Sequence, residues 1–394
     1  MTNLEKDMLS FLDRVKGVIY GTAFGDAIGA TIEKLTYEQI LEKYGRVETI
    51  LMPWHKADWS ASMRNHRQRG YGIITDDTLM TIALMNIYND VKRPLDAWDM
   101  ADGMVKEIAF KKTYIPELGR EDHIIERLFY PEKWIFQRHA LANCEPREGG
   151  IGNMINCGAA MYIAPIGIVN ACNPKAAYDE AINFASGHQA SYGLEAAGVL
   201  AGCVAKAFEP GVVIEDIVAT ALSLAKDGTK MAIQDMCEKA RQLKSQKDDH
   251  ALVVAEFQKT ILPYSPMADD VSRKIEKIGV PSNHYVPSRL FAIEELPFAL
   301  AYAVLNDGDF RQTIIGGINS GRDTDSIGVM AGVILGAMYG HKYINDEELE
   351  VLTETNKIPF KNIAEQFSET ARNMIENNSK FERHKRERLT SLMN

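Results

Sequence analysis

The hydrophobic residues of this chain recur mainly at spacings of three and four, the period of an α-helix that buries one face. The first such segment, residues 8–32, is interrupted by Gly21, Gly25 and Gly29, which lie four residues apart and therefore on one helix face. Each glycine costs a helix about 1 kcal/mol relative to alanine. This spacing therefore predicts a helix that another segment approaches closely.

The same period predicts further helices along the chain, whereas the alternation typical of strands is scarce. Residues 47–52 are the candidate for a short extended segment, and the small-residue stretch 327–340 predicts a closely packed core helix. We therefore expect a predominantly α-helical protein. Beyond the first segment, the expected helices cover residues 76–88, 95–110, 175–185, 194–208, 214–225, 231–246, 292–305, 309–318, 325–338, 346–355 and 363–377.

Composition and charge restrict the class of partner. Of the 394 residues, 46% are hydrophobic and 25% are charged, the usual balance of a globular protein. The net charge of −10 disfavours nucleic-acid polymers, which require a basic surface. Residues 1–14 do not predict a signal peptide, and no apolar run is long enough to span a membrane. The five cysteines form no C-x-x-C pair, so we expect reduced thiols in a cytoplasmic protein.

Two acidic motifs each begin an apolar helix. The first motif is Thr75-Asp76-Asp77-Thr78, and the second is Asp323-Thr324-Asp325-Ser326. Either could be an ordinary helix N-cap, for which Thr and Asp are favoured. However, neighbouring buried carboxylates repel and need a partner, and carboxylate and hydroxyl oxygens are the ligands that Mg²⁺ prefers. Together the motifs predict one site for two divalent ions, typically about 3.5–4 Å apart.

The motifs lie near opposite ends of the chain, so a shared site requires one core between them. There is no repeat of fixed period and no Ser/Gly linker, and residues 271–286 are the candidate for a long loop. Residues 379–394 are strongly charged and predict a solvated helical tail. We therefore expect a single domain over residues 1–394, with a core at about residues 12–378 and a tail at 379–394.

Other polar residues have both a structural and a functional interpretation. Asp26, within a glycine-rich apolar segment, is more typical of a buried hydrogen-bonding residue. Glu33, just past the expected helix end, is either a second carboxylate for acid–base chemistry or a solvent-facing charge. His188 follows a glycine, a position more often structural than catalytic. The glycines at 149–152 and 156–161 indicate either an anion-binding loop or a closely packed turn.

The chain resembles the ADP-ribosylglycohydrolase family, which includes the dinitrogenase-reductase-activating glycohydrolase. The resemblance implies an all-α fold, a single orthogonal multi-helix domain, with two Mg²⁺ ions in a cleft; Mn²⁺ is the alternative metal. Its segments occur in the family's order: residues 25–29 with Glu33, the motif 75–78, residues 158–161 with 165–167, His188, and residues 321–326 with the small-residue helix to Gly340.

The resemblance also implies roles for individual residues. Glu33 would orient water or contact the substrate ribose. Assigned by matching motif, the metal ligands are Thr75, Asp76, Asp77, Asp323, Asp325 and Ser326; the catalytic residues are Glu33, Asp77 and Asp323; and the substrate contacts are Asn156, Gly158 and His188.

The chain departs from the family at one segment. Where members commonly read Asn-Gly-Ala-Ala-Met-Arg, this chain has Cys157 at the Asn position and Tyr162 at the Arg position. The expected function is hydrolysis of an N- or O-glycosidic bond at C1 of ribose in an ADP-ribosyl or related ribosyl substrate. One alternative is a small-molecule ribosyl N-glycosidase that does not act on ADP-ribosylated protein. The other, a non-catalytic ribosyl-binding protein, is disfavoured by the intact acidic motifs.

Overall fold

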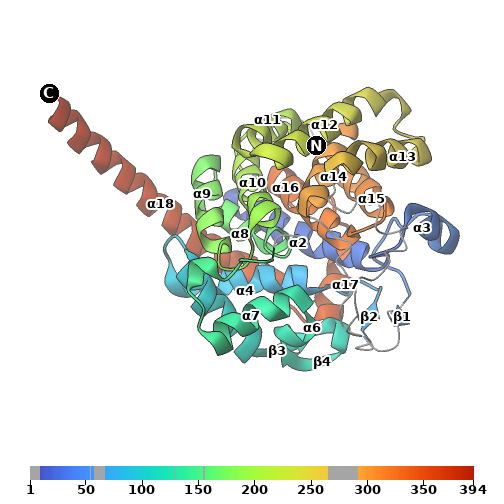
Figure 1. The fold of residues 1–394 in the computed structure, drawn as a ribbon, viewed down its shortest axis with the longest axis horizontal. Helices are drawn as coiled ribbons and strands as arrows, with labels where there is room; N and C mark the ends of the chain where they lie inside the picture. The colour runs from blue at the N-terminus through green and yellow to red at the C-terminus, as the bar shows by residue number, and fades with distance from the viewer. Residues whose placement is uncertain (1–8, 54, 57–66, 129, 154–155, 265–291) are drawn as a thin grey trace.

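The computed structural model describes residues 9–53, 55–56, 67–128, 130–153, 156–264 and 292–394. The candidate loop at 271–286 lies outside these residues. The expected all-α class is confirmed, since the described strands form only two short antiparallel pairs (Figure 1). These strands are β1 (His55–Lys56) with β2 (Gln68–Arg69), and β3 (Lys112–Ile115) with β4 (Arg120–His123).

The α-helices pack around a central pair, α2 and α16, whose labels lie near the middle of Figure 1. Apart from residues 95–110, the helices expected from the sequence are present, with the last of them, α18, extending beyond the expected 363–377 and the other ends differing by a few residues. The helices are α2 (Phe11–Ala30), α3 (Tyr37–Tyr44), α4 (Asp76–Val91), α5 (Ala97–Asp99), α6 (Ile124–Arg127), α7 (Tyr130–Ala142), α8 (Ala164–Val169), α9 (Pro174–Ala185), α10 (Ser191–Ala207), α11 (Ile214–Leu224), α12 (Asp227–Leu243), α13 (His250–Ile261), α14 (Ala292–Leu305), α15 (Phe310–Asn319), α16 (Thr324–Tyr339), α17 (Asp346–Asn356) and α18 (Phe360–Met393).

The glycines of α2 and α16 allow the two helices to touch backbone to backbone. A Cβ atom placed on Gly25 would lie 2.7 Å from the amide nitrogen of Val329 and still closer to the Gly328 carbonyl. A Cβ on Gly21 would lie 2.8 Å from the carbonyl carbon of Gly332. The close approach predicted from the glycine spacing is therefore confirmed, and the approaching segment is α16.

Two local predictions were wrong. Residues 47–52 form no strand, because the side-chain amide of Asn319 takes the place of a neighbouring strand. It accepts from Val47 N at 2.9 Å and donates to Val47 O at 2.7 Å. Residues 95–110 are not one α-helix but α5 followed by the π-helical turns 100–104 and 106–110. Their buried residues Met100, Met104 and Ile108 still recur every four positions, which is why the two helix types look alike in sequence.

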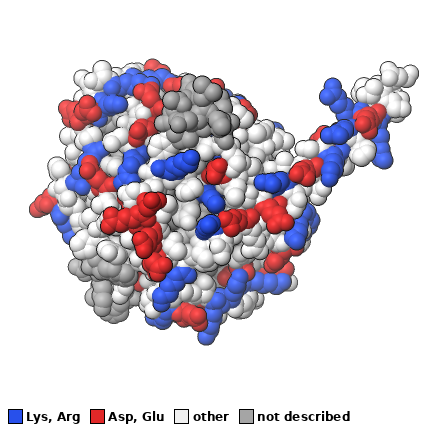
Figure 2. Space-filling view, turned by 180° about the vertical axis from the view of Figure 1, so that it is seen from behind, with Lys and Arg blue, Asp and Glu red and all other residues white. Residues whose placement is uncertain are grey.

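The C-terminal half of α18 stands free of the body of the molecule (Figure 1). Every residue from Glu376 onward is exposed, so the predicted solvated helical tail is confirmed. On the face shown in Figure 2, positive and negative side chains are interspersed, and both signs continue along this projecting helix. Among the described helices, none has the length and apolar character needed to cross a membrane.

Candidate metal centre

Residues near the C-terminal end of α2 form hydrogen bonds with both acidic motifs. The side chain of Asp26 accepts hydrogen bonds from Thr75 N at 2.9 Å and from Thr78 N at 3.1 Å, which anchors the start of α4. The carbonyl of Gly29 accepts a hydrogen bond from Thr324 Oγ1 at 2.7 Å, which anchors the start of α16. Asp26 is completely buried, and it has the structural role expected from its apolar surroundings.

The two motifs, almost the whole chain apart in sequence, meet directly. The hydroxyl of Ser326 donates to Asp77 Oδ2 at 3.1 Å. Carboxylate oxygens of Asp323, Asp325 and Glu33 all lie within 4.8 Å of one another, a spacing that fits a shared cation. Helix starts on α4 and α16 therefore place Asp77, Asp323, Asp325 and Ser326 in one buried cluster, here called the acidic cluster.

Burial and mutual repulsion disfavour negative charge in the acidic cluster. Burial raises the pKa of Asp77 well above its usual range, and the charges of Asp325 and Asp26 raise it further. Burial likewise raises the pKa of Asp323 and of Asp325, with neighbouring carboxylates adding to the effect. A divalent cation would supply the missing positive charge, so the donor set fits the metal that the sequence predicts.

Asp76 and Thr75 have partners of their own. The carboxylate of Asp76 forms an ion pair with the buried guanidinium of Arg127, which also binds Glu117. Thr75 is the N-cap of α4, and its hydroxyl accepts from Asp77 N at 3.4 Å. The structure thus places these two predicted ligands beside the acidic cluster, with Asp76 engaged by an arginine.

Glu33 is neither solvent-facing nor free. Its carboxylate lies 2.9 Å from Arg69 Nη2 and 3.1 Å from Lys34 Nζ. Burial raises the pKa of Glu33, but the charges of Lys34, Arg69 and Arg127 outweigh burial and leave the pKa below its usual range. Glu33 therefore remains ionised, so it suits cation binding or the orientation of a water molecule rather than proton donation.

The predicted substrate contacts Asn156 and Gly158 surround Glu132 on α7. The side-chain amide of Asn156 donates to Glu132 Oε1 and its Oδ1 accepts from Gln189 Nε2 at 2.7 Å. Gly158 leaves room for the Glu132 carboxylate, since a Cβ there would lie 3.1 Å from its Cδ. Sequence reasoning missed Glu132, because a single glutamate in a helix of mixed polar and apolar residues carries no signal of burial.

His188 lies in the interior of the protein, against Tyr162. It is completely buried, with Nδ1 2.7 Å from the Tyr162 hydroxyl and its ring stacked on that of Tyr162. Burial lowers the pKa of His188 to about 3, so the ring is neutral. His188 is thus held in the interior by Tyr162, and its contact with a substrate stays a prediction.

Arg322, which directly precedes the second motif, pairs with a residue outside both motifs. Its guanidinium forms two hydrogen bonds to Glu294, at 2.8 and 2.9 Å. This bidentate pair ties the loop before α16 to the start of α14. Glu294 was not recognised in the sequence analysis, since it lies far from either motif.

A family model described as ADP-ribosylglycohydrolase matches residues 7–378. The chain belongs to the ADP-ribosylglycohydrolase family. Members are metal-dependent glycohydrolases that act on ADP-ribosyl substrates, which supports glycohydrolase activity for this chain in general. The buried acidic cluster is the part of the structure that agrees with this membership.

Relatives of known sequence match over most of the chain. The protein YegU of Escherichia coli (strain K12) is 24% identical over 356 residues, covering 89% of this chain and 95% of that protein. ADP-ribosylhydrolase ARH3 of Danio rerio is 25% identical over 352 residues, covering 84% and 83% respectively. A solved structure, an ADP-ribosylglycohydrolase-related protein complex, has a TM-score of 0.60 at 19% identity, covering 92% of this chain and 99% of that one. The solved structure shows a shared fold.

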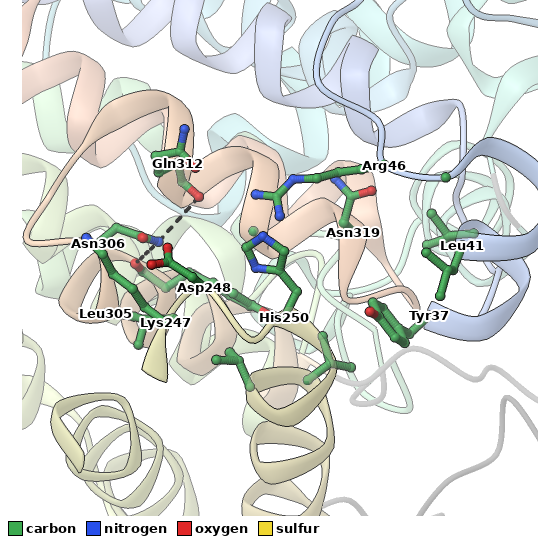
Figure 3. Close-up of a pocket in the computed structure, with 16 residues that line it drawn as sticks. Tyr37, Leu41, Arg46, Lys247, Asp248, His250, Leu305, Asn306, Gln312 and Asn319 are labelled. Carbon is green, nitrogen blue, oxygen red and sulfur yellow. Dashed lines mark hydrogen bonds between the residues drawn. The ribbon is translucent and has the colours of Figure 1, made fainter. Parts of the chain in front are cut away.

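A separate pocket of about 400 Å³ lies among α3, α13, α14 and α15 (Figure 3). The side chains of Arg46 and His250 point toward each other in it, and Asn306 donates to Gln312 O at 3.3 Å. None of the predicted site residues is among the described residues that line it. This pocket is therefore distinct from the family's acidic cluster.

Glu132 predicts a pH dependence of stability. Burial raises its pKa from 4.5 to about 7, opposed by the hydrogen bond from Asn156 and reinforced by the charge of Asp76. A raised folded-state pKa contributes stability that is complete below pH 4.5 and is lost as the pH rises through about 7. The unfolding free energy of the metal-free wild type should therefore fall between about pH 5 and pH 8. In Glu132→Gln this fall should be smaller by about 2–3 kcal/mol.

Urea unfolding at several pH values, in chelator, measures this difference. Titration of Asp26, whose pKa burial raises to about 6, is common to both proteins and cancels in the comparison. The exposed Glu126→Gln variant is the control and should follow the wild type. Parallel stability curves for wild type and Glu132→Gln would contradict the prediction.

Proposed function

We propose that this protein hydrolyses the N- or O-glycosidic bond at C1 of ribose in an ADP-ribosyl or related ribosyl substrate, with two Mg²⁺ ions or, alternatively, Mn²⁺. One observation carries the proposal: the two acidic motifs meet through Ser326 and Asp77, beside three carboxylates whose oxygens lie within 4.8 Å of one another. Family membership supports the glycosidic bond as the target.

The acidic cluster and its neighbours would hold the ions. When bound, divalent ions lower the pKa of water and polarise hydroxyl oxygens such as those of a ribose diol. The helix starts of α4 and α16, both fixed to α2, keep the donors in place without further rearrangement of the backbone. The proposed ligands are Thr75, Asp76, Asp77, Asp323, Asp325 and Ser326.

Glu33 is proposed to orient the attacking water. Lys34 and Arg69 hold it in the ionised form, so it can accept a hydrogen bond from that water. Departure of the leaving group gives C1 the positive character of an oxocarbenium ion. The remaining carboxylates, Asp77 and Asp323, stabilise that charge electrostatically.

A small ribosyl substrate is the second candidate, favoured by Tyr162. Family members commonly have arginine at this position, whereas here the tyrosine is completely buried and hydrogen-bonded to His188. An uncharged, buried side chain offers no positive charge to a pyrophosphate. This observation favours a ribosyl N-glycosidase over an enzyme that acts on ADP-ribosylated protein.

A panel of ribosides tests the proposal. The full-length protein would be incubated with ADP-ribosylated protein, ADP-ribose esters and nucleosides, and the release of ADP-ribose and of ribose would be measured. We expect turnover of at least one class, loss of turnover in EDTA, and recovery on addition of Mg²⁺ or Mn²⁺. Activity that persists in EDTA would exclude the metal-dependent mechanism, and binding without turnover would identify a ribosyl-binding protein.

A further inference from the structure

Cys157 lies against the acidic cluster. Its Sγ is 3.3 Å from Asp323 Oδ2 and 3.1 Å from Ser326 Oγ, and the residue is 4% exposed. Asp323 and Ser326 both belong to the second acidic motif at the start of α16. The thiol therefore faces oxygens that the proposed function assigns to metal binding.

Glu295 approaches the same thiol from α14. It is 1% exposed, and among the described residues no hydrogen-bond donor reaches either of its carboxylate oxygens. Its neighbour Glu294, by contrast, forms the bidentate pair with Arg322. A buried carboxylate without a donor is costly, so Glu295 requires either a proton or a cation.

The positions of these groups favour a cation. Ligand atoms of Cys157, Glu295 and Asp323 all lie within 4.8 Å of one another. In a tetrahedral site with metal–sulfur and metal–oxygen bonds of about 2.3 and 2.0 Å, a sulfur and an oxygen ligand are about 3.5 Å apart. The observed separation of 3.3 Å between Cys157 Sγ and Asp323 Oδ2 agrees with that geometry.

The thiol of Cys157 indicates which class of cation this group of ligands would bind. Carboxylates alone suit Mg²⁺, but a thiolate is a soft ligand that selects Zn²⁺ and similar transition-metal ions. A metal ion would displace the thiol proton to solvent as the metal–sulfur bond forms.

We propose that Cys157, Glu295 and Asp323 bind one transition-metal ion of the Zn²⁺ class, with Asp323 shared with the carboxylates of Glu33 and Asp325. The proposal rests on the proposed metal-dependent function. It adds two ligands and replaces Mg²⁺ or Mn²⁺ by an ion of the Zn²⁺ class at one of the two positions. The competing explanation is a proton shared between Glu295 and Asp323, which would leave Cys157 a plain thiol.

Co²⁺ binding to the metal-free, full-length protein distinguishes the two explanations. A thiolate–Co²⁺ bond produces a charge-transfer band in the near ultraviolet that oxygen ligands do not produce. We expect this band to saturate at one equivalent of Co²⁺ in the wild type and to be absent in Cys157→Ser. In Glu295→Gln, Co²⁺ affinity should fall at least about tenfold, as for loss of a charged metal ligand. Cys203→Ala, which alters a buried cysteine near the C-terminal end of α10, is the matched control and should retain the band.

Several outcomes would overturn the proposal: no band in the wild type, a band that persists in Cys157→Ser, or unchanged Co²⁺ affinity in Glu295→Gln. Circular dichroism of each variant separates loss of a ligand from loss of the fold. The same experiments distinguish failure of this proposal from failure of the proposed function. A Co²⁺ band without release of ribose from any riboside would reject the hydrolase and keep this site, whereas Mg²⁺-dependent turnover without a band would do the reverse.

Discussion

Replacing Asp77 by asparagine is expected to abolish tight binding of divalent cations and to lower kcat/KM by about a thousandfold or more. Asp77 is 2% exposed, so asparagine keeps its shape while removing one buried negative charge from the cluster. Loss of about 4 kcal/mol of electrostatic stabilisation corresponds to that factor in rate. Calorimetric titration with Mg²⁺ and Mn²⁺ and the riboside assay measure the two effects.

Unlike its activity, the stability of metal-free Asp77→Asn should not fall below that of the wild type. Burial and the charges of Asp325 and Asp26 disfavour ionised Asp77 in the metal-free protein, so a neutral amide relieves repulsion. The melting temperature without metal should stay equal or rise, while the rise produced by added Mg²⁺ in the wild type should disappear. A variant that simply misfolds would lower both.

Asp102→Asn is the control for a general effect of charge. Asp102 is an exposed residue whose carboxylate pairs with Lys106 at 2.8 Å, away from the acidic cluster. It should bind divalent ions and turn over substrate like the wild type. If Asp77→Asn retains metal binding and activity, Asp77 is not a ligand and the two motifs have only a capping role.

The two acidic motifs of the metal centre could be predicted because each is a short pattern of neighbouring residues. Asp-Thr-Asp-Ser and Thr-Asp-Asp-Thr each place carboxylates and hydroxyls on the first turn of an apolar helix, a pattern that is visible without any tertiary contact. Likewise, glycines four apart mark one helix face. That the two motifs meet could be argued in advance, because two separate buried clusters of like charge share the same need for a cation.

The charges that surround the centre could not be predicted in the same way. Arg69, Glu117 and Arg127 come from β2, from the turn between β3 and β4, and from the short helix α6, and they belong to no spacing pattern. Nevertheless, Arg69 pairs with Glu33 at 2.9 Å and with Glu117 at 3.2 Å. Their positions depend on how β2, the β3–β4 turn and α6 pack together. Sequence shows that such residues are charged, but only tertiary packing decides that they are buried and paired.

The surroundings of His188 could not be predicted for a related reason. His188 was matched through the family's order of motifs, and order alone says nothing about which way a ring points. Its neighbours Tyr162 and Phe136 come from other segments and enclose the ring completely. Where the family's arginine is replaced by an aromatic residue, the local packing changes with it, so a role carried over from the family need not hold.

Replacing Gly25 by valine is expected to prevent the native packing of α2 against α16. A Cβ at this position would lie 2.7 Å from Val329 N, and the atoms it meets belong to backbone, which cannot rotate away. The approach is reciprocal, since a Cβ on Gly328 would lie 2.9 Å from the Gly25 carbonyl carbon. The helices must separate, and we expect a loss of about 4 kcal/mol or more of unfolding free energy. Urea unfolding measures that loss.

The same displacement should dismantle the metal centre, because α2 anchors both motifs. Asp26, next to Gly25, holds the start of α4, and Gly29 holds the start of α16 through Thr324 at 2.7 Å. Gly25→Ala, the milder variant, should therefore lose Mg²⁺ affinity even where it still folds. Gly103→Ala is the control, since the nearest atoms to its added Cβ belong to the side chain of Ile87, at 3.1 Å, and not to backbone, and alanine favours a helix. Equal stability and equal metal affinity in Gly25→Ala and Gly103→Ala would show that the contact between α2 and α16 does not position the carboxylates.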